Sequence, residues 1–326
     1  MEMISESRSN TWFRGYRFVD YATQVYLVVV GIVVAVAVAC GGGPGYPAWP
    51  WLLGGHVAGV VLLHVVVLQE SGGSAPSWLR LLRNYYPVLL FGAFFRETEA
   101  VNLLLGMERW DAPLILIDEA MFGMQPSIEW MRSMSHPLVS ELFYGAYASY
   151  YLMIGGTGGW LLWRKPAAFR HFIGVVAFAF FSCFLIYHFV PVVGPRLFFV
   201  DSAERDLFIE LYGAAPTPVP ESVTGWPFAS FMGFIYRNFE AWSAAFPSSH
   251  VALSIVITWF TWHYVPKIRV LHVVMTTLLC ASTVYCGYHY VIDVFAGMAT
   301  AAILLPVGNW LYRRVDGESG GSVARW

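Results

Sequence analysis

The stretch Phe246-Pro247-Ser248-Ser249-His250 opens an apolar run, Val251 to Phe260, that is typical of a membrane helix. Proline is tolerated in the first turn of a helix, where its missing N–H costs nothing, so we expect the helix to begin at Pro247. The hydroxyl and backbone N–H groups of Ser248 and Ser249 then lie at a helix N-terminus, which is a natural binding site for an anion. The stretch therefore predicts an anion site at the end of a membrane helix.

A second polar stretch, His289-Tyr290-Val291-Ile292-Asp293, lies thirty-nine residues further along the chain. On a helix, His289 and Asp293 share one face because they are four residues apart. A carboxylate in that position holds an imidazole in one tautomer and stabilises its cation, as in a catalytic triad. Alone, this spacing is weak evidence, since an interfacial histidine with an incidental aspartate one turn away is a common arrangement.

A third stretch, Val190 to Arg196, ends another apolar run with an arginine, whose planar guanidinium suits a phosphate. Arg196, Pro-Ser-x-His and His-x-x-x-Asp, in this order, resemble the three motifs of the type 2 phosphatidic acid phosphatase superfamily. The strings Gly-Pro-Arg, Pro-Ser-x-His-Val-Ala and His-Tyr-x-x-Asp resemble in particular its inositol-phosphorylceramide-synthase-like branch. Asp118, Phe122-Gly123 and Pro126 are also similar to that branch. The resemblance covers roughly residues 80–314.

The chain departs from the superfamily pattern at two places. The first motif usually has a lysine seven residues before its arginine, and that position is Phe189. The third motif usually begins Ser-Arg, whereas this chain has Ser282-Thr283. The source of the positive charge that neutralises the phosphate is therefore open, and His188 and Arg237 are two alternatives.

The resemblance implies a role for each motif residue. His289 is the expected nucleophile, which forms a phosphohistidine and is oriented by Asp293. His250 is the expected general acid, and Arg196, Ser248 and Ser249 are expected to bind the phosphate. Simpler interpretations exist for each residue alone, namely an interfacial histidine, a helix cap or a headgroup contact. Four ionisable residues in family order favour a catalytic site, without a metal or other cofactor.

Composition places the chain in a membrane. Of its 326 residues, 57% are hydrophobic and only 12% are charged, and apolar runs of membrane-spanning length recur. The four cysteines lie in or beside these runs, without the spacing of a metal site or a disulfide framework. His56 and His64, eight residues apart, would allow a haem or metal site, but packed or lumen-facing histidines are commoner.

The apolar runs predict about eight transmembrane helices. They cover approximately residues 19–40, 51–68, 85–105, 138–163, 172–190, 247–264, 270–285 and 290–311. The third is interrupted by Arg96, Glu97 and Glu99 and could end early. The first resembles the core of a signal peptide, but we expect it to be retained. Residues 111–135 are mixed in polarity and predict one interfacial helix.

We therefore predict an all-α integral membrane fold. It comprises an N-terminal cytoplasmic arm and transmembrane hairpin (1–76), a six-helix phosphatidic-acid-phosphatase-like core (77–314) and a cytoplasmic tail (315–326). With eight spans, the segments on one side carry 13 of the 19 lysines and arginines but only 6 of the 21 acidic residues. The positive-inside rule then makes both termini cytoplasmic. The motifs fall on the opposite face, periplasmic, extracellular or luminal, of a bacterial-type cell membrane.

These features favour a lipid-phosphate phosphatase or phosphotransferase acting at the outer leaflet. One alternative is an inositolphosphotransferase-type enzyme that passes a headgroup to a lipid or inositol-type acceptor, and another is a non-catalytic lipid-phosphate-binding protein. The long connection 196–245 is of a length that is usually functional, and we expect it to cover the site, with Trp226 and Trp242 excluding water. We expect a membrane lipid phosphate as substrate and no nucleic-acid partner. The motifs leave the lipid, the acceptor and the oligomeric state open.

Overall fold

The computed structural model describes residues 13–73, 75–200, 202–239, 241 and 243–317. Within these residues the chain is helical and has no strand; one isolated bridge joins Val192 to Ala244. Trp242, which was expected to exclude water from the site, lies outside the described residues. The all-α fold expected from the apolar runs is confirmed.

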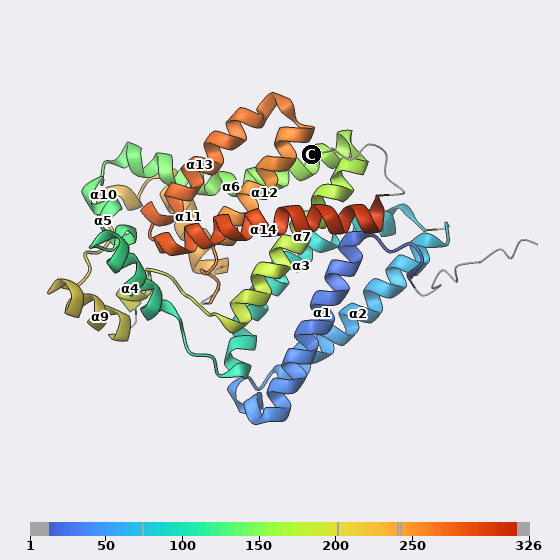
Figure 1. The fold of residues 1–326 in the computed structure, drawn as a ribbon, viewed down its shortest axis with the longest axis horizontal. Coiled ribbons are helices and arrows are strands. Elements are labelled where there is room, and N and C mark those ends of the chain that lie inside the picture. Colours follow the sequence, from blue (N-terminus) through green and yellow to red (C-terminus); the bar gives the residue numbers. More distant parts are fainter. Residues whose placement is uncertain (1–12, 74, 201, 240, 242, 318–326) are drawn as a thin grey trace, which may run out of the picture.

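Each of the eight predicted spans coincides with a long helix (Figure 1). These helices are α1 (Phe18–Ala37), α2 (Trp49–Ser71), α3 (Ser77–Leu105), α6 (Pro137–Arg164), α7 (Pro166–Phe189), α12 (Ser249–Tyr264), α13 (Arg269–Tyr285) and α14 (Val291–Asp316). Five segments are long and apolar enough to cross a membrane, namely Phe18–Gly45, Trp49–Ser71, Pro166–Phe189, Pro266–Tyr285 and Val291–Asp316. The protein is therefore a multi-pass membrane protein.

The remaining three long helices, α3, α6 and α12, are too short or not apolar enough to belong to this group. The 16-residue α12 contacts α6, α7, α13 and α14, so most of its apolar side chains are buried against protein. Contrary to one expectation, α3 does not end at its charged residues but continues to Leu105. Arg96 and Glu99 share one face of α3, whereas Glu97 points to another neighbour. The helix therefore places charge on two sides without breaking.

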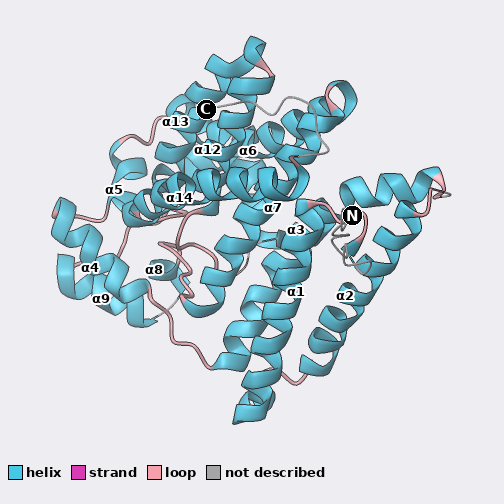
Figure 2. Ribbon diagram, turned by 45° about the vertical axis from the view of Figure 1, so that its right-hand side comes forward, coloured by secondary structure: helices cyan, strands magenta, loops and turns pink. Residues whose placement is uncertain are grey.

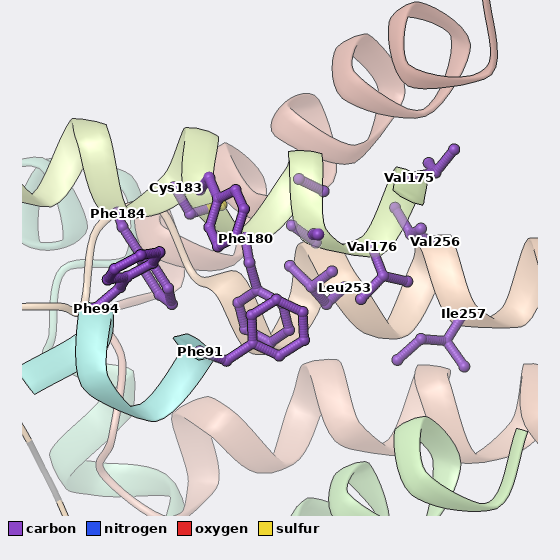
Figure 3. Close-up of a cluster of buried hydrophobic side chains, with 14 of the residues drawn as sticks. Phe91, Phe94, Val175, Val176, Phe180, Cys183, Phe184, Leu253, Val256 and Ile257 are labelled. Carbon is purple, nitrogen blue, oxygen red and sulfur yellow. The ribbon is translucent and has the colours of Figure 1, made fainter. Parts of the chain in front are cut away.

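The core is built around α7, which is buried on nearly all sides. Figure 3 shows Phe180 and Phe184 of α7 packed near Phe91 and Phe94 of α3, with Val256 of α12 further along the same cluster. A helix that is apolar all round is stable only when neighbours surround it. This packing fixes the end of α7 and therefore the start of the segment that carries Arg196.

The N-terminal helices pack against this core. α1 contacts α2, α3 and α7, and Figures 1 and 2 show α1 and α2 side by side. At one end of the three helices the buried Arg83 pairs with Asp20 at 2.6 Å and also contacts Glu70. Buried charges are tolerated when they are paired in this way, so the cluster fixes how α1, α2 and α3 meet.

The short helices gather at one end of the molecule (Figures 1 and 2). They are α4 (Asp111–Phe122), α5 (Pro126–Ser133), α8 (Leu197–Val200), α9 (Ser202–Tyr212), α10 (Glu221–Thr224) and α11 (Pro227–Phe239). The single interfacial helix expected over 111–135 is wrong, because α4 and α5 are separate helices. Gln125 is extended before Pro126, as the steric demands of a following proline require.

Candidate active site

The three motif segments lie together where α7 ends and α12 and α14 begin. The backbone N–H of Ala245 donates to the carbonyl of Val192 at 2.8 Å, which joins the first segment to the second. The backbone N–H of Ser248 donates to the carbonyl of Asp293 at 3.1 Å, which joins the second to the third. Backbone hydrogen bonds therefore fix the relative position of segments that are about fifty residues apart in sequence.

The start of α12 differs from the expectation. The helix begins at Ser249 with Ser248 as its N-cap, and Pro247 precedes it, with a cis peptide bond after Phe246. The backbone N–H of Ser248 donates to Asp293 and that of Ser249 donates to the Tyr187 hydroxyl at 3.2 Å. These two N–H groups are thus already hydrogen-bonded. The hydroxyl of Ser248 is the group that faces the catalytic residues, 3.2 Å from Nε2 of His289.

His289 lies in the turn before α14 rather than on the helix, but the expected contact with Asp293 is present. Nδ1 of His289 is 3.2 Å from Oδ2 of Asp293, which also accepts the Tyr290 backbone N–H at 2.9 Å. His289 is 3% exposed. This burial, with a smaller contribution from His250, lowers the pKa of His289 to about 3. The imidazole is therefore neutral at pH 7, with its proton on Nδ1 toward the carboxylate and its electron pair on Nε2 toward the Ser248 hydroxyl.

His250 lies on the first turn of α12, with its ring centroid 6.0 Å from that of His289. The Tyr147 hydroxyl is 3.2 Å from Nδ1 of His250 and 2.9 Å from the hydroxyl of Tyr236. The ring of Tyr150 packs on His250 with centroids 4.7 Å apart. The two histidines are close enough for a single phosphoryl group to contact both.

Two aspartates on α4, Asp111 and Asp118, hold the site together. Asp111 accepts the backbone N–H groups of Val193 and Gly194 at 3.0 and 2.8 Å. Burial raises the pKa of its carboxyl above the ordinary value, an effect that these two donors oppose. Asp118 accepts two backbone N–H groups in the first turn of α14, from Val291 at 2.8 Å and from the next residue at 3.1 Å, and burial raises its pKa also. The role of Asp111 was not predicted, because nothing local in sequence indicates what a carboxylate at a helix start will meet.

Glycine is required at two positions of the site. Gly194 has φ +97, and a Cβ there would lie 2.7 Å from the carbonyl oxygen of Tyr288. A Cβ on Gly297 of α14 would lie 2.6 Å from the carbonyl oxygen of Ser248. Both distances are below any real contact, so a side chain at either place would move the backbone of a motif segment.

A cavity of about 730 Å³ adjoins the motifs, a size typical of a small-molecule site; Arg196 lines it, whereas Ser248, His250 and His289 are not among its lining residues. We call it the active-site cavity. Its described lining includes the four arginines Arg96, Arg132, Arg196 and Arg237, with Glu99 as the acidic residue among them. Nη2 of Arg196 donates to the carbonyl of Ala241 at 2.7 Å, which holds the guanidinium in place. Four cations around one acid make the cavity suitable for a phosphorylated headgroup.

The two alternatives for the missing lysine, His188 and Arg237, lie in different surroundings. Arg237 lines the active-site cavity, whereas His188 is fully buried and its Nε2 lies 3.3 Å from the Tyr26 hydroxyl on α1. Phe189, at the position of the missing lysine, is 45% exposed. Arg96 and Arg132 were not predicted to join the site, since α3 and α5 reach it only through the tertiary fold.

Part of the long connection, α11, lines the active-site cavity. The ring of Tyr236 stacks on that of Tyr288 with centroids 3.7 Å apart, and both rings line the active-site cavity. Two backbone N–H groups in the first turn of α11, those of Phe228 and Ala229, donate to Glu141 of α6. Trp226, which was expected to exclude water, is instead 42% exposed because it precedes the helix face that turns inward.

Comparisons with known proteins agree with the motif pattern. The sequence model of the PAP2 superfamily matches residues 113–307. A PA-phosphatase related-family protein of Dictyostelium discoideum is 23% identical over 255 residues, which cover 68% of this chain and 44% of the relative. The chain thus spans less than half the length of that relative. No solved structure matches the chain.

Proposed function

The chain belongs to the PAP2 superfamily, and from this premise and the site geometry we propose that it is a lipid-phosphate phosphatase that works through a phosphohistidine. The observation that carries the proposal is the sequence of contacts from Asp293 through His289 to Ser248, with His250 beside it. In this arrangement Nε2 of His289 is an uncharged nucleophile, its Nδ1–H is held by a carboxylate, and a second imidazole is within reach of a leaving group.

In the first half-reaction, Nε2 of His289 attacks phosphorus while the bond from phosphorus to the lipid oxygen breaks. His250 gives its proton to that oxygen, so a neutral lipid alcohol leaves and the phosphoryl group stays on His289. Arg196 binds the non-bridging oxygens, and the Ser248 hydroxyl contributes a further hydrogen bond. Asp293 stabilises the positive charge that develops on the His289 ring.

In the second half-reaction, water takes the place of the lipid alcohol. His250, now neutral, accepts a proton from the water as its oxygen attacks phosphorus. The bond from phosphorus to Nε2 breaks, inorganic phosphate leaves, and the free His289 returns to its neutral form. One histidine thus acts first as acid and then as base.

A second candidate is a headgroup transferase of the inositolphosphotransferase type, in which an alcohol replaces water in the second half-reaction. The stacked rings of Tyr236 and Tyr288 favour this candidate if they cover the bound substrate, because a covered site suppresses hydrolysis of a reactive intermediate. Arginines and tyrosines around one cavity also suit a phosphorylated polyol, with guanidinium groups for the phosphate and aromatic rings for the ring faces.

Both candidates require a membrane orientation, and we propose that the active site opens on the non-cytoplasmic side with both termini cytoplasmic. The excess of lysine and arginine on the opposite segments supports this orientation. The lipid phosphate would then enter from the outer leaflet.

The decisive experiment supplies purified protein with labelled phosphatidic acid, polyprenyl diphosphate and phosphatidylinositol, each with and without a ceramide or diacylglycerol acceptor. Free phosphate from the first two lipids alone supports the phosphatase. A new phospholipid that forms only with acceptor supports the transferase. His289→Ala should abolish either product and the acid-labile phosphoenzyme, while it leaves the thermal unfolding temperature nearly unchanged. Lipid binding without any product from the unmodified protein would refute both and favour a non-catalytic lipid-phosphate-binding protein.

A further inference from the structure

A second cavity, of about 430 Å³, lies between α1, α2 and α3. We call it the hairpin cavity. It is lined mainly by aliphatic side chains, such as Leu27 of α1, Leu63 of α2 and Leu89 of α3. Gly55 of α2 lines it as well, and a Cβ there would meet no atom within 4 Å. The cavity is therefore an apolar space that the absence of a side chain at Gly55 helps to keep open.

One end of the hairpin cavity is polar. His56 of α2 and Glu97 of α3 both line it, with Nε2 of His56 at 3.2 Å from Oε2 of Glu97. The other carboxylate oxygen of Glu97 accepts the Tyr26 hydroxyl at 2.7 Å. His56 is 3% exposed, and neither of its ring nitrogens has a hydrogen-bond partner among the described residues; Nδ1 also lacks the nearby carboxylate that Nε2 has. A buried ring nitrogen without a hydrogen-bond partner costs free energy of folding. Nδ1 therefore indicates a ligand that forms a hydrogen bond with it.

The charge of this polar end selects the ligand. In the tautomer that carries the ring proton on Nε2, the nitrogen 3.2 Å from Oε2 of Glu97, Nδ1 presents an electron pair, which accepts a hydrogen bond from a hydroxyl. The carboxylate next to it repels a phosphate or a fatty-acid carboxylate. A hydroxyl is thus favoured over an anionic headgroup.

The apolar walls of the hairpin cavity determine the length and the apolar character of the rest of the ligand. Along α2, Trp51 and Leu52 line the cavity on one side of His56. On the other side the walls extend from His56 to Val66, ten residues that span about 15 Å at the rise of an α-helix. This length is about half of the ~30 Å hydrocarbon core of a bilayer, the depth that a single leaflet supplies. A hydrocarbon chain fits this space, and its hydroxyl end would then lie against His56.

We propose that the hairpin cavity binds a long-chain lipid alcohol, with the hydroxyl donating to Nδ1 of His56. A lipid alcohol is also what leaves the active site in the first half-reaction or enters it as an acceptor; that part of the inference rests on the proposed function. The polar end is connected to the active-site side through Tyr26, whose hydroxyl lies 3.3 Å from Nε2 of His188 in the last turn of α7. The N-terminal hairpin, which lies outside the region that matches the superfamily, thereby gains a specific role.

The test uses the full chain in lipid nanodiscs and a photoreactive analogue of hexadecanol, with the labelled residues mapped by mass spectrometry. Labelling should concentrate on α2 and α3 around the cavity and should be competed by hexadecanol but not by palmitate. Gly55→Leu fills the cavity and should reduce labelling by about tenfold or more, in line with the selectivity that one or a few carbon atoms give in a tight pocket.

Gly54→Leu is the matched control, because a Cβ at Gly54 also meets no atom within 4 Å but this position does not line the cavity. It should leave labelling unchanged. Labelling that is equal in Gly55→Leu and the unmodified chain, that palmitate competes as well as hexadecanol does, or that is spread over all lipid-facing helices would overturn the proposal. The competition arm needs no variant, so it decides the matter even where Gly55→Leu does not fold.

The experiment is repeated in the His289→Ala chain, which removes turnover. Labelling that persists there, together with active unmodified protein, supports both proposals. Absence of phosphatase and transferase activity from the unmodified chain, with intact labelling, would refute only the proposed function. Absence of cavity labelling in a chain that hydrolyses lipid phosphate would refute only the hairpin cavity as an alcohol site.

Discussion

Replacing Asp293 with asparagine tests the chemistry of the site more sharply than replacing it with alanine, because the two carboxylate oxygens of Asp293 differ in their hydrogen bonds. Oδ2 accepts both hydrogen bonds, from Nδ1–H of His289 at 3.2 Å and from the backbone N–H of Tyr290 at 2.9 Å. Oδ1 has no hydrogen-bond partner among the described residues. An asparagine can therefore keep its carbonyl oxygen in the Oδ2 position and turn its NH₂ group to the unused side. The tautomer of His289 is then preserved, and what is lost is the negative charge.

The expected decrease in the rate of phosphoenzyme formation follows from the loss of the negative charge of Asp293. A hydrogen bond to a charged group contributes about 1 to 1.5 kcal/mol more than a neutral one, which corresponds to roughly a tenfold change in rate. Full loss of the Coulomb interaction at 4 Å and an effective dielectric constant of 20 would cost about 4 kcal/mol, or roughly a thousandfold. We expect the Asp293→Asn rate of phosphoenzyme formation to fall between these limits. Asp293→Ala loses the charge and the orientation of the ring, and should be at least about tenfold slower still.

The assay is a rapid-quench measurement of phosphohistidine formation with saturating lipid phosphate, on both variants and on unmodified protein. Thermal unfolding of each variant serves as the control for folding. An asparagine variant no faster than the alanine variant would mean that the amide reverses the tautomer, and the assignment of Oδ2 and Oδ1 would be wrong. An asparagine variant as fast as the unmodified protein would remove any role for the charge.

Three further predictions concern pH, the cover and the orientation. Because burial lowers the pKa of His289 to about 3, the ring stays neutral and nucleophilic well below its ordinary pKa of 6.5; kcat/KM, corrected for the ionisation of the substrate, should therefore not fall as the pH is lowered from about 8 to about 5, whereas the need for a protonated His250 limits it on the basic side, and an acid limb near 6.5 would contradict this. Tyr236→Ala removes the ring that stacks on Tyr288 and should raise hydrolysis relative to transfer by about fivefold or more, whereas Tyr236→Phe, which keeps the stack, should change the ratio less than about twofold. Single cysteines at Ser230 and Ser319, in a chain whose four cysteines are replaced, should react with an impermeant thiol reagent from opposite sides of the membrane; labelling of both from the same side would refute the eight-span arrangement and the external active site.

The sequence predicted the parts of the molecule whose physical cause is local. Long apolar runs become helices wherever they occur, and each motif keeps its chemistry within five or six neighbouring residues. Even so, the local reasoning placed Pro247 inside α12 and His289 on α14, and both precede their helices. The contact between His289 and Asp293 survives this difference because a residue just before a helix and the third residue within it are also neighbours.

The residues that support the motifs could not be predicted in this way. Asp111 acts on Val193 and Gly194, which are more than eighty residues away, and its own surroundings in sequence contain no sign of them. Tyr236 reaches the site only because Glu141 holds the start of α11 on α6. Side chains of this kind are recognised by their partners in space, so a single sequence identifies the chemistry of a site before it identifies what positions that chemistry.

The charged residues of α3 show how the fold resolves a pattern that the sequence left ambiguous. Three ionisable side chains within four residues suggested a helix that ends early, since charges in a membrane span are costly unless they face a partner or a cavity. In the structure Arg96 and Glu99 face the active-site cavity, and Glu97 faces His56 in the hairpin cavity. Because successive residues of a helix point about 100° apart, a single turn of α3 can supply polar groups to two separate cavities. The position of this turn between the two cavities is the reason to expect the N-terminal hairpin to take part in handling the lipid, in addition to anchoring the chain.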